Sequence, residues 1–427
     1  MRKGVKRSHI LILCIVTTVL AACASTVDMA ATVTPQATPT DLPLPTKQPG
    51  LEELFPGEFS DCILAAEATL PPFAVPEPLV PDHVAGNTDD PAIIMVVYND
   101  LQCPYCAAFH EVTQLLLREY PDELQVIYRH LPLFMVHGNA FIAAQALEAA
   151  ALQNQQAFFE VQDHLFTHQG EWQALSPEDF SSYLRGLLPT FELDPDLFEQ
   201  AMIDEATTLA LLNDLDAALQ AGITTTPFIL INGQVYTALS RDLSTIRTII
   251  ELELLKERQF NQCPPRVIDE GISYNATLHT SQGDIIIKLY PEYAPLAVNN
   301  FLFLAQQGWY DQLPFYMVIP DEFALTGDPS GSSLGTPGYT FRSEINPALT
   351  FDRTGIIAMN NAGSPNSNGS QFFITYGPLP AYNNKFTIFG QVLQGLDVLQ
   401  NLTPRNPASD PTSAPADLLL SVTIDAK

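Results

Sequence analysis

Hydrophobic and polar residues follow two different patterns along the chain, and the pattern changes near residues 264–272. In the first region, residues 93–98 form an unbroken apolar run, which predicts a strand buried on both faces of a sheet with parallel neighbours. Apolar residues within 109–117 then recur every three or four positions, which predicts a helix that ends at Pro121. A second strand over 124–128 completes a strand–helix–strand unit, which is typical of an α/β fold.

The rest of the first region is mainly helical. Residues 139–219 are rich in Ala, Leu and Gln with helical periodicity. Asn232 and Gly233 then separate two short apolar runs, which is a strong signal for a two-residue hairpin turn. A helix over about 242–255 is expected to close the region.

The second region contains short strands of alternating pattern. Strands are expected over 276–280 and 284–290, with frequent Gly, Asn and Pro between the later ones. Only two helices are indicated, over about 295–307 and 393–401. This pattern predicts a closed antiparallel barrel.

The N-terminus has the features of an export signal. Four basic residues precede an apolar run over 10–20, and Leu20-Ala21-Ala22 leads directly into Cys23. This arrangement resembles the bacterial lipobox, which implies removal of residues 1–22 and lipid attachment at Cys23. Lipid chains would anchor the protein to a membrane without spanning it. The alternatives are an ordinary signal peptide cut nearby and an uncleaved anchor.

Residues 23–58 are rich in Pro and Thr, which indicates a disordered, extended linker rather than a packed element. Its expected role is to hold the folded parts away from the lipid.

The chain is strongly acidic, with 48 Asp and Glu residues against 19 Lys and Arg and a formal net charge of −29. Such a surface repels phosphate backbones, so nucleic acid is excluded as a partner. The charge indicates solubility but identifies no substrate.

Six cysteines occur in the chain. Cys14 leaves with the signal and Cys23 receives lipid, so four cysteines are expected to face an oxidising compartment. Cys62 and Cys263 bracket the first region, and we expect them to form a structural disulfide that ties the two ends of that region together. Free or intermolecular thiols are the alternative.

Cys103 and Cys106 are separated by two residues where the buried strand meets the helix. Unpaired N–H groups and the helix dipole stabilise a thiolate at this position, and only the thiolate attacks a disulfide. Cys103 is therefore the expected nucleophile and Cys106 the resolving thiol. The alternatives are half of a zinc site, disfavoured because no second pair has zinc spacing, and a structural disulfide. No metal or other cofactor is expected.

Residues 98–106, 128–133 and 222–228 resemble the DsbA-like branch of the thioredoxin fold. The resemblance covers about 80–256 and implies a thioredoxin-fold domain, here bounded at 59–264, with an inserted helical subdomain. The family has a cis-proline beside the active-site cysteines. Pro227 matches it, so Thr226 and Pro227 are expected to bind substrate.

Tyr105 departs from this family, in which strongly oxidising members often have His before the second Cys. Without that imidazole we expect a less stabilised Cys103 thiolate and a less oxidising disulfide. The sequence leaves open whether the domain oxidises, reduces or isomerises disulfides.

The second region, over 270–427, resembles the cyclophilins. Residues 280–285, 294–301 and 338–341 carry the likeness, and 355–363 with 368–374 carry it most specifically. The resemblance implies an eight-stranded antiparallel barrel with two helices that isomerises X-Pro peptide bonds.

The substrate groove of this second domain matches the family in part. The resemblance assigns substrate binding to a set of residues that includes Met317 at the position of the catalytic Arg: Phe315, Met317, Asn361, Gln371, Phe373 and Tyr382. Leu325 stands where the family has Gln, and Glu322 stands at an aromatic pocket position unless a one-residue shift places Phe323 there. Because Met offers no hydrogen-bond donor, the domain is expected to be either a weak isomerase or a module that only binds proline peptides.

The combined prediction is an extracytoplasmic, membrane-anchored folding factor with thiol–disulfide oxidoreductase activity and a prolyl isomerase domain of reduced strength. Its expected partners are unfolded or folding exported proteins, an unidentified redox partner, and the membrane through Cys23. The alternative is a tethered, non-catalytic chaperone or adaptor that binds proline-containing clients.

Overall fold

The computed structural model describes residues 62–65, 72–74, 83–237, 240–407 and 415–427. The predicted signal peptide, Cys23 and the linker to residue 58 lie outside the described residues. Among the helices described, none is both long enough and apolar enough to cross a membrane.

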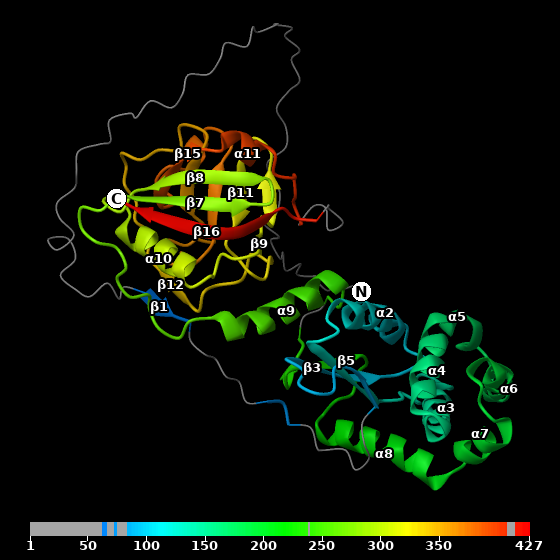
Figure 1. Cartoon of the computed structure of the whole chain (residues 1–427). Helices are drawn as coiled ribbons and strands as arrows, with labels where there is room; N and C mark the ends of the chain where they lie inside the picture. The colour runs from blue at the N-terminus through cyan, green and yellow to red at the C-terminus, as the bar shows by residue number, and fades with distance from the viewer. Residues whose placement is uncertain (1–61, 66–71, 75–82, 238–239, 408–414) are drawn as a thin grey trace, which may run out of the picture. The chain divides into compact units, whose positions relative to one another are not determined.

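The first region is built on a five-stranded sheet with the order β2-β4-β3-β5-β6. Figure 1 labels β3 and β5 of this sheet. Its strands are β2 (His83–Gly86), β3 (Ile93–Asn99), β4 (Leu124–His130), β5 (Phe228–Ile231) and β6 (Gln234–Val235). β3 pairs with β4 in parallel and with β5 in antiparallel orientation, so the expectation of parallel neighbours holds on one side only. The expectation of burial on both faces also holds in part, because Ile94 is 37% exposed.

Two helices flank the sheet and six more form the inserted part. α2 (Pro104–Glu119) follows β3, and α9 (Leu243–Leu255) closes the region and packs against α2 and β3. The inserted helices are α3 (Ala140–Gln153), α4 (Gln155–Thr167), α5 (Gln169–Trp172), α6 (Pro177–Leu187), α7 (Pro195–Met202) and α8 (Glu205–Gln220). Side-chain caps separate several of them: Ser176, Asp194 and Asp204 accept hydrogen bonds from the first-turn N–H groups of α6, α7 and α8.

The hairpin between β5 and β6 turns at Asn232 and Gly233, as predicted. Both residues have positive φ, 47° and 75°, which the two-residue turn requires. The Asn232 side chain also accepts a hydrogen bond from the Ile94 N–H at 2.8 Å. This contact ties the turn to β3.

The second region is a curled antiparallel sheet of nine strands with the order β10-β11-β14-β13-β15-β8-β7-β16-β9. The strands are β7 (Tyr274–Thr280), β8 (Gly283–Leu289), β9 (Leu313–Pro314), β10 (Met317–Ile319), β11 (Phe323–Thr326), β13 (Ile356–Met359), β14 (Phe372–Thr375), β15 (Ile388–Gln394) and β16 (Leu418–Ala426). Two helices accompany them, α10 (Pro295–Gln306) and α11 (Leu396–Gln400).

The sheet has nine strands where the family resemblance implies eight. The difference arises because β9 and β10 are consecutive pieces of one chain segment. β9 pairs with β16, whereas β10 pairs with β11 at the other end of the sheet order. The chain between them breaks the strand at Phe315 and Tyr316, so one segment joins both ends of the sheet. Buried aromatic side chains, including Phe301, Phe372 and Phe389, fill the interior.

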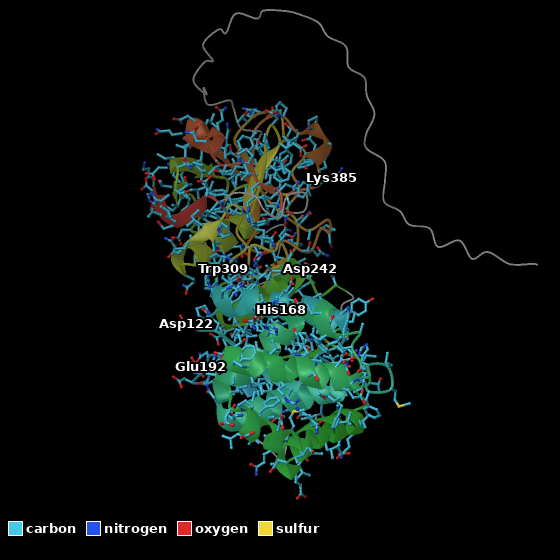
Figure 2. All side chains as sticks on the ribbon, turned by 90° about the vertical axis from the view of Figure 1, so that its right-hand side faces the viewer. Asp122, His168, Glu192, Asp242, Trp309 and Lys385 are labelled. Carbon is cyan, nitrogen blue, oxygen red and sulfur yellow. A yellow bond between two sulfur atoms is a disulfide. The ribbon has the colours of Figure 1, made fainter. Side chains whose placement is uncertain are left out.

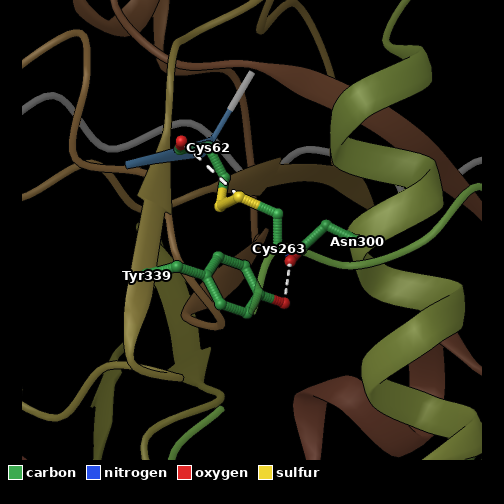
Figure 3. The surroundings of a disulfide bond; sticks show 4 residues. All are labelled: Cys62, Cys263, Asn300 and Tyr339. Carbon is green, nitrogen blue, oxygen red and sulfur yellow. Dashed lines mark hydrogen bonds between the residues drawn. A yellow bond between two sulfur atoms is a disulfide. The ribbon is translucent and has the colours of Figure 1, made fainter. Parts of the chain in front are cut away.

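Cys62 and Cys263 form a disulfide across 201 residues of sequence (Figure 3). The structure differs from the expectation in where this bridge lies. β1 (Cys62–Leu64) pairs with β12 (Tyr339–Phe341), a strand from the second region, and the side chain of Cys62 packs against the core of that region. The bridge therefore fastens the N-terminal strand to the barrel, because β1 finds its hydrogen-bond partners on β12 rather than on the five-stranded sheet.

The segment that follows α9 also packs on the barrel. The Phe260 N–H donates to the Pro337 carbonyl at 2.8 Å. The Arg258 guanidinium carbon lies 5.5 Å from the ring centroid of Trp309, which is labelled in Figure 2. These contacts place the chain around Cys263 beside its disulfide partner.

Candidate active sites

Cys103 lies at the N-cap of α2, and Pro104 occupies the first turn. The Cys103 carbonyl accepts hydrogen bonds from the N–H groups of Cys106 and Ala107, so the first turn begins at the cysteine itself. Proline suits the start of a helix because its missing N–H would have no partner there. Cys103 is 5% exposed and Cys106 is fully buried, and both are free thiols.

The two thiols have opposite pKa shifts. The hydrogen bond from the Cys106 thiol lowers the pKa of Cys103 to about 6, against an opposing effect of burial and with help from the N–H groups of Cys106 and Tyr105. Burial raises the pKa of Cys106 well above its ordinary value, and the neighbouring Cys103 adds to this effect. At neutral pH Cys103 is therefore mainly the nucleophilic thiolate, while Cys106 holds its proton.

The loop before β5 brings the predicted Thr226 and Pro227 to this site. The peptide bond between them is cis, and Cys103 Sγ lies 3.7 Å from the Thr226 carbonyl oxygen. The Arg241 guanidinium donates to the Pro227 carbonyl at 3.3 Å. Residues 123 positions apart in sequence thus line one surface at the reactive sulfur.

Asp100 is a site residue that the sequence analysis missed. Its backbone N–H lies 3.5 Å from Cys106 Sγ, and its carboxylate is buried. A signal for it existed in the sequence, since an acidic residue at the end of an apolar strand is unusual and stands three positions before the nucleophile.

A second buried group in this domain surrounds Glu148. Both His83 Nε2 and His130 Nε2 donate to Glu148 Oε1, at 2.9 and 2.8 Å. Burial alone would raise the pKa of Glu148, but the hydrogen bonds from His130 and His83 outweigh burial and lower it to about 2. Burial likewise opposes the charge on His130, yet the contact with Glu148 raises its pKa. This group joins β2, β4 and α3 through one carboxylate.

In the barrel, four cross-strand partners form one continuous row. Met317 faces Leu325, Leu325 faces Phe373, and Phe373 faces Ala358. All four belong to one apolar cluster together with Tyr382. The structure therefore brings together three of the predicted groove residues, Met317, Phe373 and Tyr382, and Leu325 lies in the same cluster.

Aromatic rings surround Phe373. Its ring centroid lies 5.3 Å from that of Phe386, 5.7 Å from Phe323 and 5.9 Å from Tyr382. Glu322 is exposed in the turn before β11, whereas Phe323 packs in the cluster. Phe323, and not Glu322, therefore contributes an aromatic ring to this cluster.

Gln371 is 8% exposed, and its side-chain amide is fully engaged within the protein. Its nitrogen donates to the carbonyls of Ser333 and Gly335, both at 3.0 Å. Its oxygen accepts from the Tyr316 hydroxyl at 2.6 Å and from Asn360 at 2.8 Å. The amide thus holds the loop over 333–335 and has no donor left for a peptide.

Two other predicted groove residues also have internal roles. Asn361 Nδ2 donates to the Lys385 carbonyl at 2.8 Å, and its oxygen accepts from the Gly363 N–H at 3.2 Å. Phe315 is fully buried in the barrel core, away from the aromatic cluster. The hydrophobic pattern of the sequence could not show that Asn361 and Phe315 differ from Phe373 in this respect. All three lie in short segments, where a single kink in the backbone reverses the face to which a side chain points.

No group of three or more His, Cys, Asp or Glu side chains among the described residues is arranged to hold a metal ion.

Comparison with known proteins identifies a family model for each region. A model described as cyclophilin type peptidyl-prolyl cis-trans isomerase/CLD matches residues 275–423, and a model described as thioredoxin matches residues 79–251. Peptidyl-prolyl cis-trans isomerase ppi1 of Schizosaccharomyces pombe is 42% identical over 154 residues, which are 35% of this chain and 99% of that protein. Peptidyl-prolyl cis-trans isomerase CYP18-2 of Arabidopsis thaliana is 41% identical over 136 residues, 31% of this chain and 82% of the relative.

Two solved structures are also similar. The cyclophilin type peptidyl-prolyl cis-trans isomerase cgd2_1660 of Cryptosporidium parvum is 32% identical, with a TM-score of 0.33, over 36% of this chain and 98% of that one. The alpha-DsbA1 protein of Wolbachia pipientis is 23% identical, with a TM-score of 0.37, over 43% of this chain and 96% of that one.

Proposed function

Because the chain belongs to the cyclophilin-type peptidyl-prolyl cis-trans isomerase family through its second domain and carries a thioredoxin-type domain before it, we propose that it is an extracytoplasmic protein-folding factor. In this proposal the first domain exchanges disulfides in client proteins, as DsbA-like proteins do. The second domain binds the prolyl segments of the same clients and isomerises them slowly. Disulfide rearrangement and proline isomerisation are both slow steps of folding. A client with disulfides and prolines would therefore fold faster if both activities acted on it.

The observation that carries the proposal is the placement of Cys103. Its sulfur sits at the start of α2 with a pKa of about 6, and the Thr226 carbonyl lies 3.7 Å away. A structural disulfide would gain nothing from a thiolate held beside a substrate-binding turn. This geometry favours exchange chemistry.

The exchange step follows from the two pKa shifts. The Cys103 thiolate attacks a client disulfide, forms a mixed disulfide and releases one client sulfur as thiolate. Cys106 then loses its proton to solvent and attacks Cys103 Sγ, which breaks the mixed bond and releases the second client sulfur. The client is reduced by two electrons and the Cys103–Cys106 pair is oxidised by two. The reverse sequence oxidises a client dithiol.

The barrel supports peptide binding more strongly than fast catalysis. Met317 and Leu325 are apolar and directly opposed, and the Gln371 amide is engaged with the loop over 333–335. Loss of one preorganised donor typically costs about a hundredfold to a thousandfold in rate. The aromatic cluster around Phe373 remains, and it suits the ring of proline.

The extracytoplasmic location is supported by the Cys62–Cys263 disulfide, since such bonds persist in oxidising compartments. We propose that a lipid on Cys23 tethers the chain to a membrane and that the linker to residue 58 spaces the domains from it.

Insulin reduction tests the first activity. The wild-type chain is expected to turn over insulin with dithiothreitol as reductant, and Cys103→Ser is expected to abolish the turnover. Equal turnover by the two proteins would instead support the non-catalytic adaptor. Wild-type turnover of an X-Pro peptide at the rate of an ordinary cyclophilin would overturn the proposed weakness of the second domain.

A further inference from the structure

The buried carboxylate of Asp100 connects the cysteine motif to a distant loop. Oδ1 accepts a hydrogen bond from the Gln102 N–H at 2.8 Å. Oδ2 accepts from the Leu133 N–H at 2.8 Å and from His137 Nδ1 at 2.7 Å. The Asp100 side chain has no exposed surface, and that of His137 is 19% exposed.

The backbone of the same residue contacts both ends of the motif. The Asp100 carbonyl accepts from the Cys103 N–H at 3.1 Å, and the Asp100 N–H points at Cys106 Sγ at 3.5 Å. Carboxylate and backbone together hold the peptide plane of residue 100 in one orientation. A donor at this distance favours a thiolate on Cys106, against the effect of burial.

The loop that Asp100 holds is also anchored at its other end. The Asn139 N–H donates to Gln102 Oε1 at 2.8 Å, so residues 133–139 are bonded to the stretch immediately before Cys103. His137 closes this arrangement through a side chain 37 positions from Asp100. The hydrogen bond between His137 and the Asp100 carboxylate lies on the same residue whose backbone N–H is aimed at the resolving sulfur.

We propose that Asp100 and His137 are positioning residues for Cys106 in the second step of exchange, an inference that rests on the proposed thiol chemistry. The deprotonated Cys106 sulfur attacks Cys103 Sγ, the mixed disulfide bond breaks, and the client sulfur departs with the electron pair as a thiolate. The oriented Asp100 N–H stabilises the attacking thiolate of Cys106. The first step, attack by Cys103, does not use this N–H.

The reaction of the reduced full-length chain with dithiobis(nitrobenzoate) separates the two steps. Attack by Cys103 releases one coloured thionitrobenzoate, and resolution by Cys106 releases a second. Asp100→Ala keeps the backbone N–H but removes the carboxylate that orients it. We expect this variant to slow the second release about tenfold, the effect of a lost hydrogen bond to a charged group, and to change the first by less than twofold. Asp100→Asn, which keeps an oxygen acceptor, and His137→Ala should slow the second release less.

Asp163→Asn is the matched control. Asp163 pairs with the buried His110, on the same helix as Cys106, at 2.9 Å, and this pair has no bond to either active-site sulfur. Both releases should stay at wild-type rates in this variant.

An unchanged second release in Asp100→Ala overturns the inference, as does equal slowing of both releases. If Asp100→Ala does not fold, judged by its thermal unfolding, Asp100→Asn and His137→Ala decide by the same criterion. Because the reagent replaces a client, the result stands apart from the proposed function, whose failure would appear as absent insulin turnover.

Discussion

Met317 and Leu325 are direct cross-strand partners on β10 and β11. The family resemblance places a catalytic Arg and a Gln at these two positions, so both polar members of one facing pair are replaced by apolar side chains. A lone apolar replacement would leave its polar partner without a hydrogen bond, whereas two together pack against each other and against Phe373.

Restoring this pair should restore catalysis. We expect Met317→Arg with Leu325→Gln to raise kcat/KM for an X-Pro peptide about a hundredfold, because a donor returns to the twisted amide. Met317→Arg alone should gain less, since its guanidinium would face Leu325. A protease-coupled assay measures the rates, and an unchanged rate in the folded double variant would contradict the weak-isomerase proposal.

The low pKa of Cys103 should depend on its partner thiol. The hydrogen bond from Cys106 is the largest cause of the shift to about 6. Cys106→Ala should therefore raise the pKa of Cys103 toward its ordinary value of 9.0. The pH dependence of iodoacetamide alkylation reports this change, with Cys103→Ser as the unreactive control. The same midpoint in wild type and Cys106→Ala would refute the assignment.

Glu148 should stabilise the thioredoxin-type domain over a defined pH range. Its folded-state pKa of about 2 lies below the ordinary 4.5, so its contribution is complete above about 4.5 and is lost as the pH falls toward 2. The raised pKa of His130 acts in the other direction, with a contribution that is present below 6.5 and lost as the pH rises through the folded-state value.

Glu148→Gln should accordingly destabilise the domain by about 3 to 5 kcal/mol near pH 5 to 6, because two buried imidazoles lose their carboxylate. Calorimetric unfolding at several pH values measures this difference, which should shrink on acidification. A difference that stays constant down to pH 2 would show that the carboxylate charge is not the cause.

The disulfide should stabilise the barrel and not the five-stranded sheet. Closing a loop across 201 residues corresponds to roughly 5 kcal/mol in the chain-entropy model. Cys62→Ser with Cys263→Ser should lower the unfolding temperature of the barrel and increase amide exchange at Tyr339–Phe341, where β1 pairs. Increased exchange confined to β2–β6 would contradict this placement.

Several features of both domains could be predicted from the sequence because they depend on neighbouring residues. The start of α2 at Cys103, the hairpin at Asn232 and Gly233, and the helix at residue 295 all follow from local spacing and turn chemistry. Thr226 and Pro227 were also predicted, but only through the resemblance, since their approach to Cys103 spans 123 positions.

Other features escaped prediction because side chains of one type have several partners available in a folded chain. A glutamine in the motif before Phe372 reads as a substrate ligand, yet its four hydrogen-bonding capacities are met by Tyr316, Asn360, Ser333 and Gly335. Asp100 has an unusual position at the end of an apolar strand, but its contact with His137 exists only after the loop folds against it.

The sequence by itself determined the two kinds of fold and the reactive cysteine pair, because hydrophobic periodicity and the start of a helix are properties of adjacent residues. Tertiary structure alone decided that Cys62 joins the barrel, that Gln371 holds a loop, and that Asp100 aims its N–H at Cys106. Each of these is a hydrogen-bond choice among distant groups, and only the folded backbone brings one candidate within reach.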